Sequence, residues 1–169
     1  MTTFNLRDVR LRPGEEHREE VELELEPLVL AGQEYVPAPA EVPATLRVTR
    51  ATSGTVLGLE SRVRLEGPCF RCLAETELEL PLELREYQAH DPAASDEERS
   101  EYVSDDVVDL STWARDAVAL ALPDKILCRS DCAGLCPVCG KDLNLEPHVH
   151  EEEQGDSRWA ALEALREEL

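Results

Sequence analysis

Six cysteines, gathered in two short stretches of the chain, are the residues best suited to chemistry: Cys69, Cys72, Cys128, Cys132, Cys136 and Cys139. Two of the intervals are Cys-x2-Cys turns, which bring two sulfur atoms close enough to share one tetrahedral zinc at Zn–S distances of about 2.3 Å. Gly140 follows the last pair and can adopt the positive φ that turns a backbone around a metal. The spacing therefore predicts zinc binding. A set of three disulfides would suit an exported chain, and a redox dithiol would suit a βαβ unit, which neither pair has around it.

Two histidines just after the last pair raise the number of candidate ligands to eight, enough for one or two zinc ions, because a structural zinc takes four. The favoured division has one site of Cys69, Cys72, Cys128 and Cys132, and a second site of Cys136, Cys139, His148 and His150. His148 and His150 follow Cys136 and Cys139 closely enough to close a local loop around one ion. Cys69 and Cys72 have no other ligand nearby in the sequence and need a distant pair, which Cys128 and Cys132 supply. An alternative division places Cys69, Cys72, Cys136 and Cys139 on a single ion.

A zinc held by four protein ligands has no position left for water, and catalysis by a metal needs one. The chain also shows no nucleophile–base constellation, phosphate-binding loop or carboxylate-plus-histidine metal motif. We therefore expect structural zinc and no enzymatic activity. The alternatives are a zinc-dependent regulatory protein, a metal buffer, or a thiol or metal enzyme. His17 and His90 lie far from the cysteines in sequence and are expected at the surface.

The elements that position these ligands are predicted to be mostly strands. Apolar residues alternate with charged ones over residues 18–30, 62–66 and 76–87, as in half-buried strands, and residues 46–50 and 55–59 indicate a hairpin around Thr52-Ser53-Gly54. Residues 32–43, with three prolines, are predicted to be a loop. The first Cys-x2-Cys should then be a knuckle joining two strands. The expected fold is α+β, an antiparallel sheet or partly open barrel with one packed helix, zinc knuckles and a short C-terminal helix.

Two helices are predicted. One is capped by Asp109 or Ser111 and stopped by Pro123, and Trp113, Ala117, Leu120 and Ala121 should form the face that covers the sheet. The other spans residues 156–169 and carries apolar residues at helical spacing. The expected organisation is a β region with the first knuckle (1–88), an acidic flexible loop (89–106), the helix and Cys-rich region of the same domain (107–150), and an acidic helical tail (151–169).

Charge restricts the partners. The chain carries a net charge of -20, and aromatic residues are 4% of it, which disfavours broad phosphate contact and base stacking. Residues 43–72 are the exception, with five arginines against two glutamates: Arg47, Arg50, Arg62, Arg64 and Arg71. A basic protein partner therefore fits the acidic faces, and these arginines are the candidates for local contact with RNA or a partner. No small-molecule substrate is indicated.

The amino-terminal residues lack an apolar signal segment, and the longest stretch without charge, residues 51–59, is far shorter than the roughly 20 residues of a membrane span. A cytoplasmic location is the default expectation, and no membrane contact is predicted.

In order and spacing, several segments over roughly residues 60–165 resemble the YceD family of bacterial and plastid proteins. The segments are Cys69-Phe70-Arg71-Cys72-Leu73, Leu120-Ala121-Leu122-Pro123, Cys128-x3-Cys132-Ala133-Gly134-Leu135-Cys136-Pro137-Val138-Cys139-Gly140, Leu143-Asn144 and Asp156-x-Arg158-Trp159-Ala160-Ala161-Leu162.

The YceD family is tied to accumulation of large-subunit ribosomal RNA, and its gene often lies beside that of a zinc-ribbon protein of that subunit. The resemblance implies a non-enzymatic factor for 23S ribosomal RNA accumulation, processing or ribosome assembly, with a basic ribosomal protein or an RNA-processing factor as partner. Some members of the family lack the CPxCG element, and some replace Cys128 and Cys132 with histidine. That pattern suits the division that pairs these two positions with Cys69 and Cys72.

Overall fold

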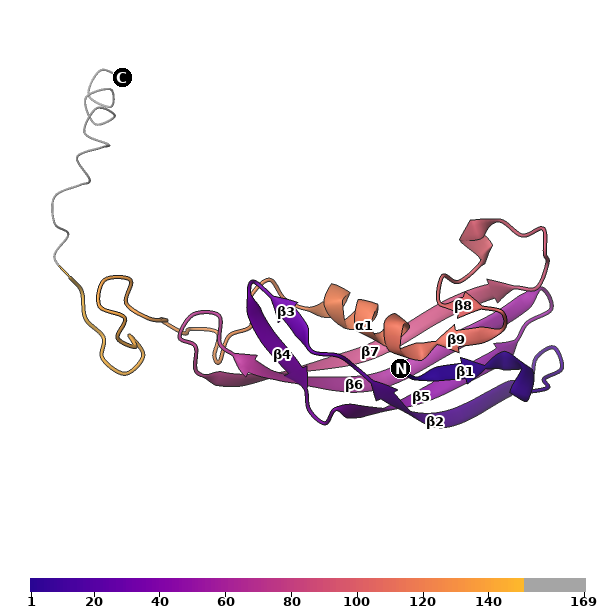
Figure 1. Ribbon diagram of the computed structural model, residues 1–169, viewed down its shortest axis with the longest axis horizontal. Helices are drawn as coiled ribbons and strands as arrows, with labels where there is room; N and C mark the ends of the chain where they lie inside the picture. The colour runs from indigo at the N-terminus through magenta and orange to yellow at the C-terminus, as the bar shows by residue number, and fades with distance from the viewer. Residues whose placement is uncertain (151–169) are drawn as a thin grey trace, which may run out of the picture.

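Within residues 1–150, long antiparallel strands form one large sheet, and a single α-helix lies on one face of it (Figure 1). The computed structural model describes residues 1–150. The six-stranded sheet has the order β2-β5-β6-β4-β3, with β7 paired to β6, and a small sheet has the order β1-β9-β8. The strands are β1 (Thr3–Asn5), β2 (Glu16–Glu24), β3 (Leu28–Leu30), β4 (Gln33–Pro37), β5 (Glu41–Arg50), β6 (Gly54–Pro68), β7 (Glu75–Ala89), β8 (Val103–Ser104) and β9 (Val107–Asp109). The helices are α1 (Leu110–Ala121) and the 3-10 turns η1 (Leu6–Asp8) and η2 (Asp96–Glu98).

The core lies between the sheet and α1. Leu57, Leu59, Val63 and Leu65 of β6 are buried on one face of the sheet, because alternate strand residues point to the same face. The expected α+β fold, with an antiparallel sheet and one packed helix, is confirmed. Within residues 1–150, no helix is long and apolar enough to cross a membrane.

The helix begins where expected but buries a different face. The carboxylate of Asp109 caps it by accepting a hydrogen bond from the Thr112 N–H at 3.0 Å. Trp113 packs into the core as expected, whereas Leu120 is 88% exposed. The predictions for Leu120 and Ala121 were wrong, because the whole last turn of α1 (119–121) is exposed.

Three strand assignments also differ from expectation. The predicted loop 32–43 contains β4, whose Tyr35 is 1% exposed, and prolines at its end had obscured the strand pattern. Residues 54–68 form one continuous strand rather than two, because β7 pairs with β6 along its whole length. Residues 90–106 contain η2 and also β8, which pairs with β9. The predicted helix over 156–169 lies outside the described residues.

Candidate metal centres

The first Cys-x2-Cys is the turn between β6 and β7, as its sequence position predicts. Pro68 and Glu75 are the last paired residues of the two strands, and the turn begins directly after them. The Cys69 N–H donates to the Ala74 carbonyl at 2.7 Å, and the Leu73 N–H donates to the Cys69 carbonyl at 3.0 Å. Leu73 has a φ of +62°, which lets the chain reverse within this short turn. Both sulfur atoms are thereby held at the tip of a rigid hairpin.

The second cysteine pair reaches this hairpin from the chain that follows α1 (Figure 1). The Phe70 N–H donates to the Ile126 carbonyl at 2.8 Å, and Ile126 is buried in the core. Cys128 and Cys132 come soon after Ile126 in the chain. The β6–β7 turn and the post-helix segment are therefore in contact through a backbone hydrogen bond as well as through their sulfur atoms.

We name Cys69, Cys72, Cys128 and Cys132 centre 1. Their four Sγ atoms all lie within 4.8 Å of one another. The Cys69–Cys132 and Cys72–Cys128 sulfur pairs are 3.8 and 3.6 Å apart. Four sulfurs at zinc-bond length in a tetrahedron stand about 3.8 Å apart, so the spacing fits a zinc–thiolate site. It exceeds the roughly 2 Å of a disulfide bond, and all six cysteines are free thiols.

The ionisation of these thiols explains why centre 1 suits a cation. Burial acts to raise the pKa of Cys69, but hydrogen bonds from the backbone of Cys72, Cys128 and Arg71 outweigh it and lower the pKa to about 6. Loss of hydration, followed by contact with the neighbouring thiols, raises the pKa of Cys128 to about 12. One thiolate therefore keeps its neighbours protonated, and a divalent cation among them would offset that repulsion.

Two polar side chains support centre 1 from outside. The Asn144 Nδ2 donates to Cys132 Sγ at 3.5 Å, while its Oδ1 accepts from the Ala133 N–H at 2.8 Å. Arg71 donates through Nη1 to the Cys132 carbonyl at 2.7 Å. A hydrogen bond to a ligand sulfur stabilises the thiolate form and fixes its direction. Sequence reasoning assigned no role to Asn144, although it belongs to the segments that carried the family resemblance.

Centre 2, which we define as Cys136, Cys139, His148 and His150, also has its ligand atoms within 4.8 Å of one another. Cys139 Sγ lies 3.1 Å from His148 Nε2. Nδ1 of the same ring lies 2.7 Å from the Glu146 carbonyl oxygen, which can only accept, so Nδ1 carries the proton. In the neutral ring Nε2 is then the atom with a free lone pair, which is the arrangement of a metal-binding histidine.

The turn around centre 2 has its own backbone supports. The Cys136 N–H donates to the Lys141 carbonyl and the Gly140 N–H donates to the Cys136 carbonyl, both at 2.8 Å. Gly140 has a φ of +72°, as its place after the pair predicts. A hydrogen bond from the backbone of Cys139, partly opposed by burial, lowers the pKa of Cys136 to about 6. Cys139 and His150 are exposed, whereas in centre 1 Cys128 is exposed and the other three cysteines are buried.

The two centres are adjacent. The Leu135 N–H donates to the Arg71 carbonyl at 3.1 Å, and a Cβ added at Gly134 would lie 3.1 Å from Arg71 Cβ. The ligand atoms thus gather in the two groups of the favoured division. Cys136 and Cys139 do not join Cys69 and Cys72, as the alternative would require.

The arginines proposed for RNA or partner contact are mostly bound to other groups. Arg62 pairs with Glu79 at 3.0 Å, and Arg64 lies 3.8 Å from Glu66. Arg71 bonds to the Cys132 backbone, as described above. Arg50 donates to His90 Nε2 at 2.7 Å, so His90 has a specific partner that its sequence did not indicate.

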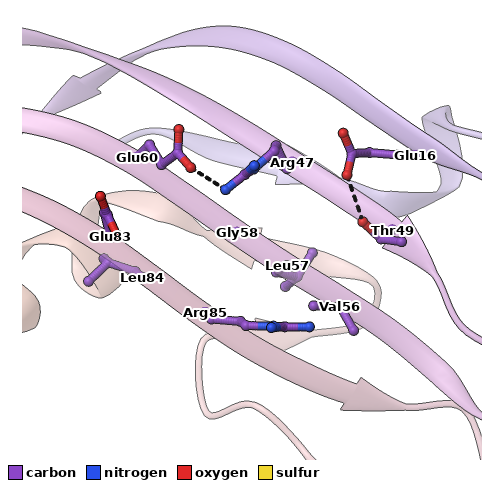
Figure 2. A pocket seen from close by; sticks show the side chains of 10 residues that line it. All are labelled: Glu16, Arg47, Thr49, Val56, Leu57, Gly58, Glu60, Glu83, Leu84 and Arg85. Carbon is purple, nitrogen blue, oxygen red and sulfur yellow. Dashed lines mark hydrogen bonds and ion pairs between the residues drawn. The ribbon is translucent and has the colours of Figure 1, made fainter.

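Arg47 lies on the face of the sheet opposite α1, in a pocket of about 400 Å³ (Figure 2). Figure 2 shows its guanidinium turned toward Glu60, with which it forms an ion pair. Gly58 stands between Arg47 and Arg85 in the strand register, so no side chain separates them. Glu16, Glu60 and Glu83 also line the pocket and outnumber its two arginines. The side chains that line this pocket therefore carry no net positive charge.

Tyr35 supports the strand end that leads into the first knuckle, a contact that the sequence did not indicate. Tyr35 donates its hydroxyl to the Pro68 carbonyl at 2.8 Å. A Cβ at Gly67 would lie 2.4 Å from Tyr35 Cδ1, so the aromatic ring occupies the space that any larger residue would need. Gly67 is accordingly a packing residue within β6 rather than a turn residue.

Comparison with known proteins places both centres inside a recognised family region. The family described as "Large ribosomal RNA subunit accumulation protein YceD" matches residues 57–166. Two relatives, one from Mycobacterium tuberculosis and one from Mycobacterium bovis, both described as uncharacterized, are each 39% identical over 121 residues. A Mycobacterium leprae relative is 36% identical over 98 residues.

The matches to the first two relatives cover 69% of this chain and 58% of each relative, so the chain spans less than two thirds of their length. The match to the Mycobacterium leprae relative covers 56% of this chain and 45% of that protein. No solved structure matches the chain significantly.

Proposed function

The chain belongs to the YceD family, and on that premise we propose that it is a non-enzymatic zinc-binding factor that supports 23S ribosomal RNA accumulation, processing or ribosome assembly. The link to large-subunit ribosomal RNA accumulation comes from the description of the family. The bound zinc, the partner and the step of ribosome production are our own proposal.

We base the proposal on the geometry of centre 1. Its sulfurs come from two segments, the β6–β7 turn and the stretch after α1, and stand at the spacing of a zinc tetrahedron. A zinc there would join these segments and add folding free energy on the order of 10 kcal/mol. Centre 2 would do the same for the chain between Cys136 and His150.

A structural role for both ions follows from the ligand count. Each centre offers four ligand atoms, so neither would keep a coordination position for water or substrate. Two thiols of centre 1, Cys69 and Cys132, are also poorly placed for exchange with an external dithiol because they are 0% exposed, and the pKa of the exposed Cys128 is raised to about 12 by loss of hydration, which disfavours its reactive thiolate.

The partner surface is proposed from charge. Glu75, Glu77, Glu79 and Glu83 lie on the exposed face of β7, directly beyond the first knuckle. Glu79 and Glu77 are paired with Arg62 and Arg64, and Glu75 and Glu83 have no ion pair within residues 1–150. A basic ribosomal protein or a basic RNA-processing factor would find complementary charge there.

The direct test is ribosomal RNA in a strain that lacks the gene. We expect a lower ratio of large- to small-subunit ribosomal RNA, restored by the wild-type chain and not by a Cys69→Ser, Cys72→Ser double variant. A Cys139→Ser variant separates the contribution of centre 2. An unchanged ratio in the deletion strain would contradict the proposed function.

A further inference from the structure

A second cavity lies at the end of the sheet away from the metal centres. It has a volume of about 480 Å³ and forms where residues 6–11 pass over the β5–β6 hairpin. The Gly14 N–H donates to the Arg50 carbonyl at 2.8 Å, and the Leu6 N–H donates to the Asp106 carbonyl at 2.8 Å, which holds the passing chain in place. The volume falls in the range of ligand sites.

The cavity is positively charged although the chain is strongly acidic. Among its described lining residues are Arg7, Arg10 and Arg50, with Asp106 as the acidic one. Arg7 uses Nε to bond Asp106 at 2.8 Å. Arg10 has no hydrogen-bond or ion-pair partner anywhere in residues 1–150. Two positive charges therefore remain uncompensated in the cavity.

The Arg50 side chain is held in position. His90 Nε2 lies 2.7 Å from Arg50 Nη1 and 2.8 Å from Thr55 Oγ1, and Thr55 is 6% exposed. A guanidinium can only donate, so His90 Nε2 accepts this hydrogen bond and carries no proton. The imidazole ring is therefore neutral and places no second positive charge beside Arg50. Loss of hydration, and then the charge of Arg50, lower the pKa of His90, which agrees with a neutral ring. A guanidinium held in this way loses little freedom when it binds a ligand.

We propose that this cavity binds the phosphate group of a nucleotide, presented as a phosphodiester of single-stranded RNA or as a free nucleotide. Arg7, Arg10 and Arg50 supply charge-assisted hydrogen bonds to the phosphate oxygens. Leu6, Leu11 and Val48 line the same cavity and give an apolar surface for the ribose or base. RNA as the source of the phosphate rests on the proposed function.

The position of the cavity separates it from the zinc chemistry. Thr55 lies near the start of β6 and Cys69 directly follows its end, so the two are roughly 45 Å apart at the rise of an extended strand. The pocket of Figure 2 is the weaker candidate for a phosphate, because its glutamates outnumber its arginines.

The test is fluorescence anisotropy of a short labelled oligouridine with the full chain, competed by uridine monophosphate and by inorganic phosphate. The variants are Arg10→Gln, which removes an unpaired side chain, and Arg50→Gln. The matched control is Arg115→Gln, the same change at an arginine of α1 that lies outside the cavity and is paired with Asp116.

We expect each cavity variant to bind the oligouridine about tenfold more weakly, with a salt slope lower by about one, while the control binds like the wild type. Competition by the mononucleotide as strong as by the oligomer would support the cavity with a free nucleotide as its ligand. Equal binding by the cavity variants and the wild type, an equal loss in the control, or no binding by the wild type would overturn the inference. The ribosomal RNA ratio of the deletion strain is independent of these results, so the proposed function can stand or fail separately.

Discussion

Sγ of Cys69 and Sγ of Cys132 lie 3.8 Å apart although 63 residues separate them in the chain. The first belongs to a strand-to-strand turn and the second to the segment after α1, and both are fully buried. A metal at this point would therefore join the two halves of the folded chain.

Replacing Cys69 by serine should remove the zinc of centre 1. A hydroxyl is a poor zinc ligand, and about 10 kcal/mol of binding free energy is coupled to folding. We expect one zinc fewer per chain and a large fall in melting temperature, measured by metal analysis and circular dichroism. Cys139→Ser is the matched control, because Cys139 is exposed in centre 2 and should cost less stability. Equal melting temperatures for Cys69→Ser and the wild type would show that centre 1 does not hold the fold.

Asn144 should tune the affinity of centre 1 without being a ligand. Asn144→Asp replaces the amide that donates to Cys132 Sγ by a carboxylate that repels the thiolate. We expect zinc affinity about 10- to 100-fold weaker, measured by competition with a chromophoric chelator. Asn5→Asp, at the cap of η1, makes the same change outside both centres and should leave zinc affinity unchanged. Wild-type affinity in Asn144→Asp would remove this role.

Chelation should release the two metals at different rates. Two of the four ligands of centre 2, Cys139 and His150, are exposed, whereas in centre 1 Cys128 alone is exposed and Cys69 and Cys132 are 0% exposed. We expect a fast phase and a slow phase of equal amplitude when excess chelator is mixed with the loaded protein. The fast phase should vanish in Cys139→Ser. A single phase in the wild type would contradict the assignment of two unlike centres.

Gly67→Ala should destabilise the chain by about 1–3 kcal/mol, because the new methyl group would meet the Tyr35 ring at 2.4 Å. Urea unfolding measures the change in the free energy of unfolding. Gly58→Ala in the same strand is the control, since its nearest neighbour would be at an ordinary 3.6 Å. If both variants unfold at the same urea concentration, the packing of Tyr35 beneath the knuckle is not important for stability.

Local patterns in the sequence predicted much of the fold. Alternation of apolar and charged residues predicted the strand that became β7, and the turn residues around Cys69 predicted a knuckle at its start. The β4 strand was missed because Pro37 and the prolines after it conceal its pattern. The position of Leu120 was missed because helical spacing does not say which turns of the helix the core covers.

The charged side chains that stay unpaired were harder to predict, because ion pairs between neighbouring strands depend on the strand register. Arg62 and Arg64 stand in a basic stretch of sequence, yet β7 brings Glu79 and Glu77 beside them. Conversely, Arg10 and Arg50 are 40 residues apart in sequence, and the passage of the amino-terminal chain over the β5–β6 hairpin puts them in one cavity. The grouping of cysteines could be proposed from spacing, but the support from Asn144 required the folded chain.

Native mass spectrometry of the freshly purified chain, combined with thiol titration, would count the metal ions and the reactive cysteines together. We expect two zinc ions per chain, one for each group of four ligands, and thiols that react only after the metal is removed. A single bound ion would contradict the two-centre arrangement. A folded chain that carries no metal and has six freely reactive thiols would contradict the whole account.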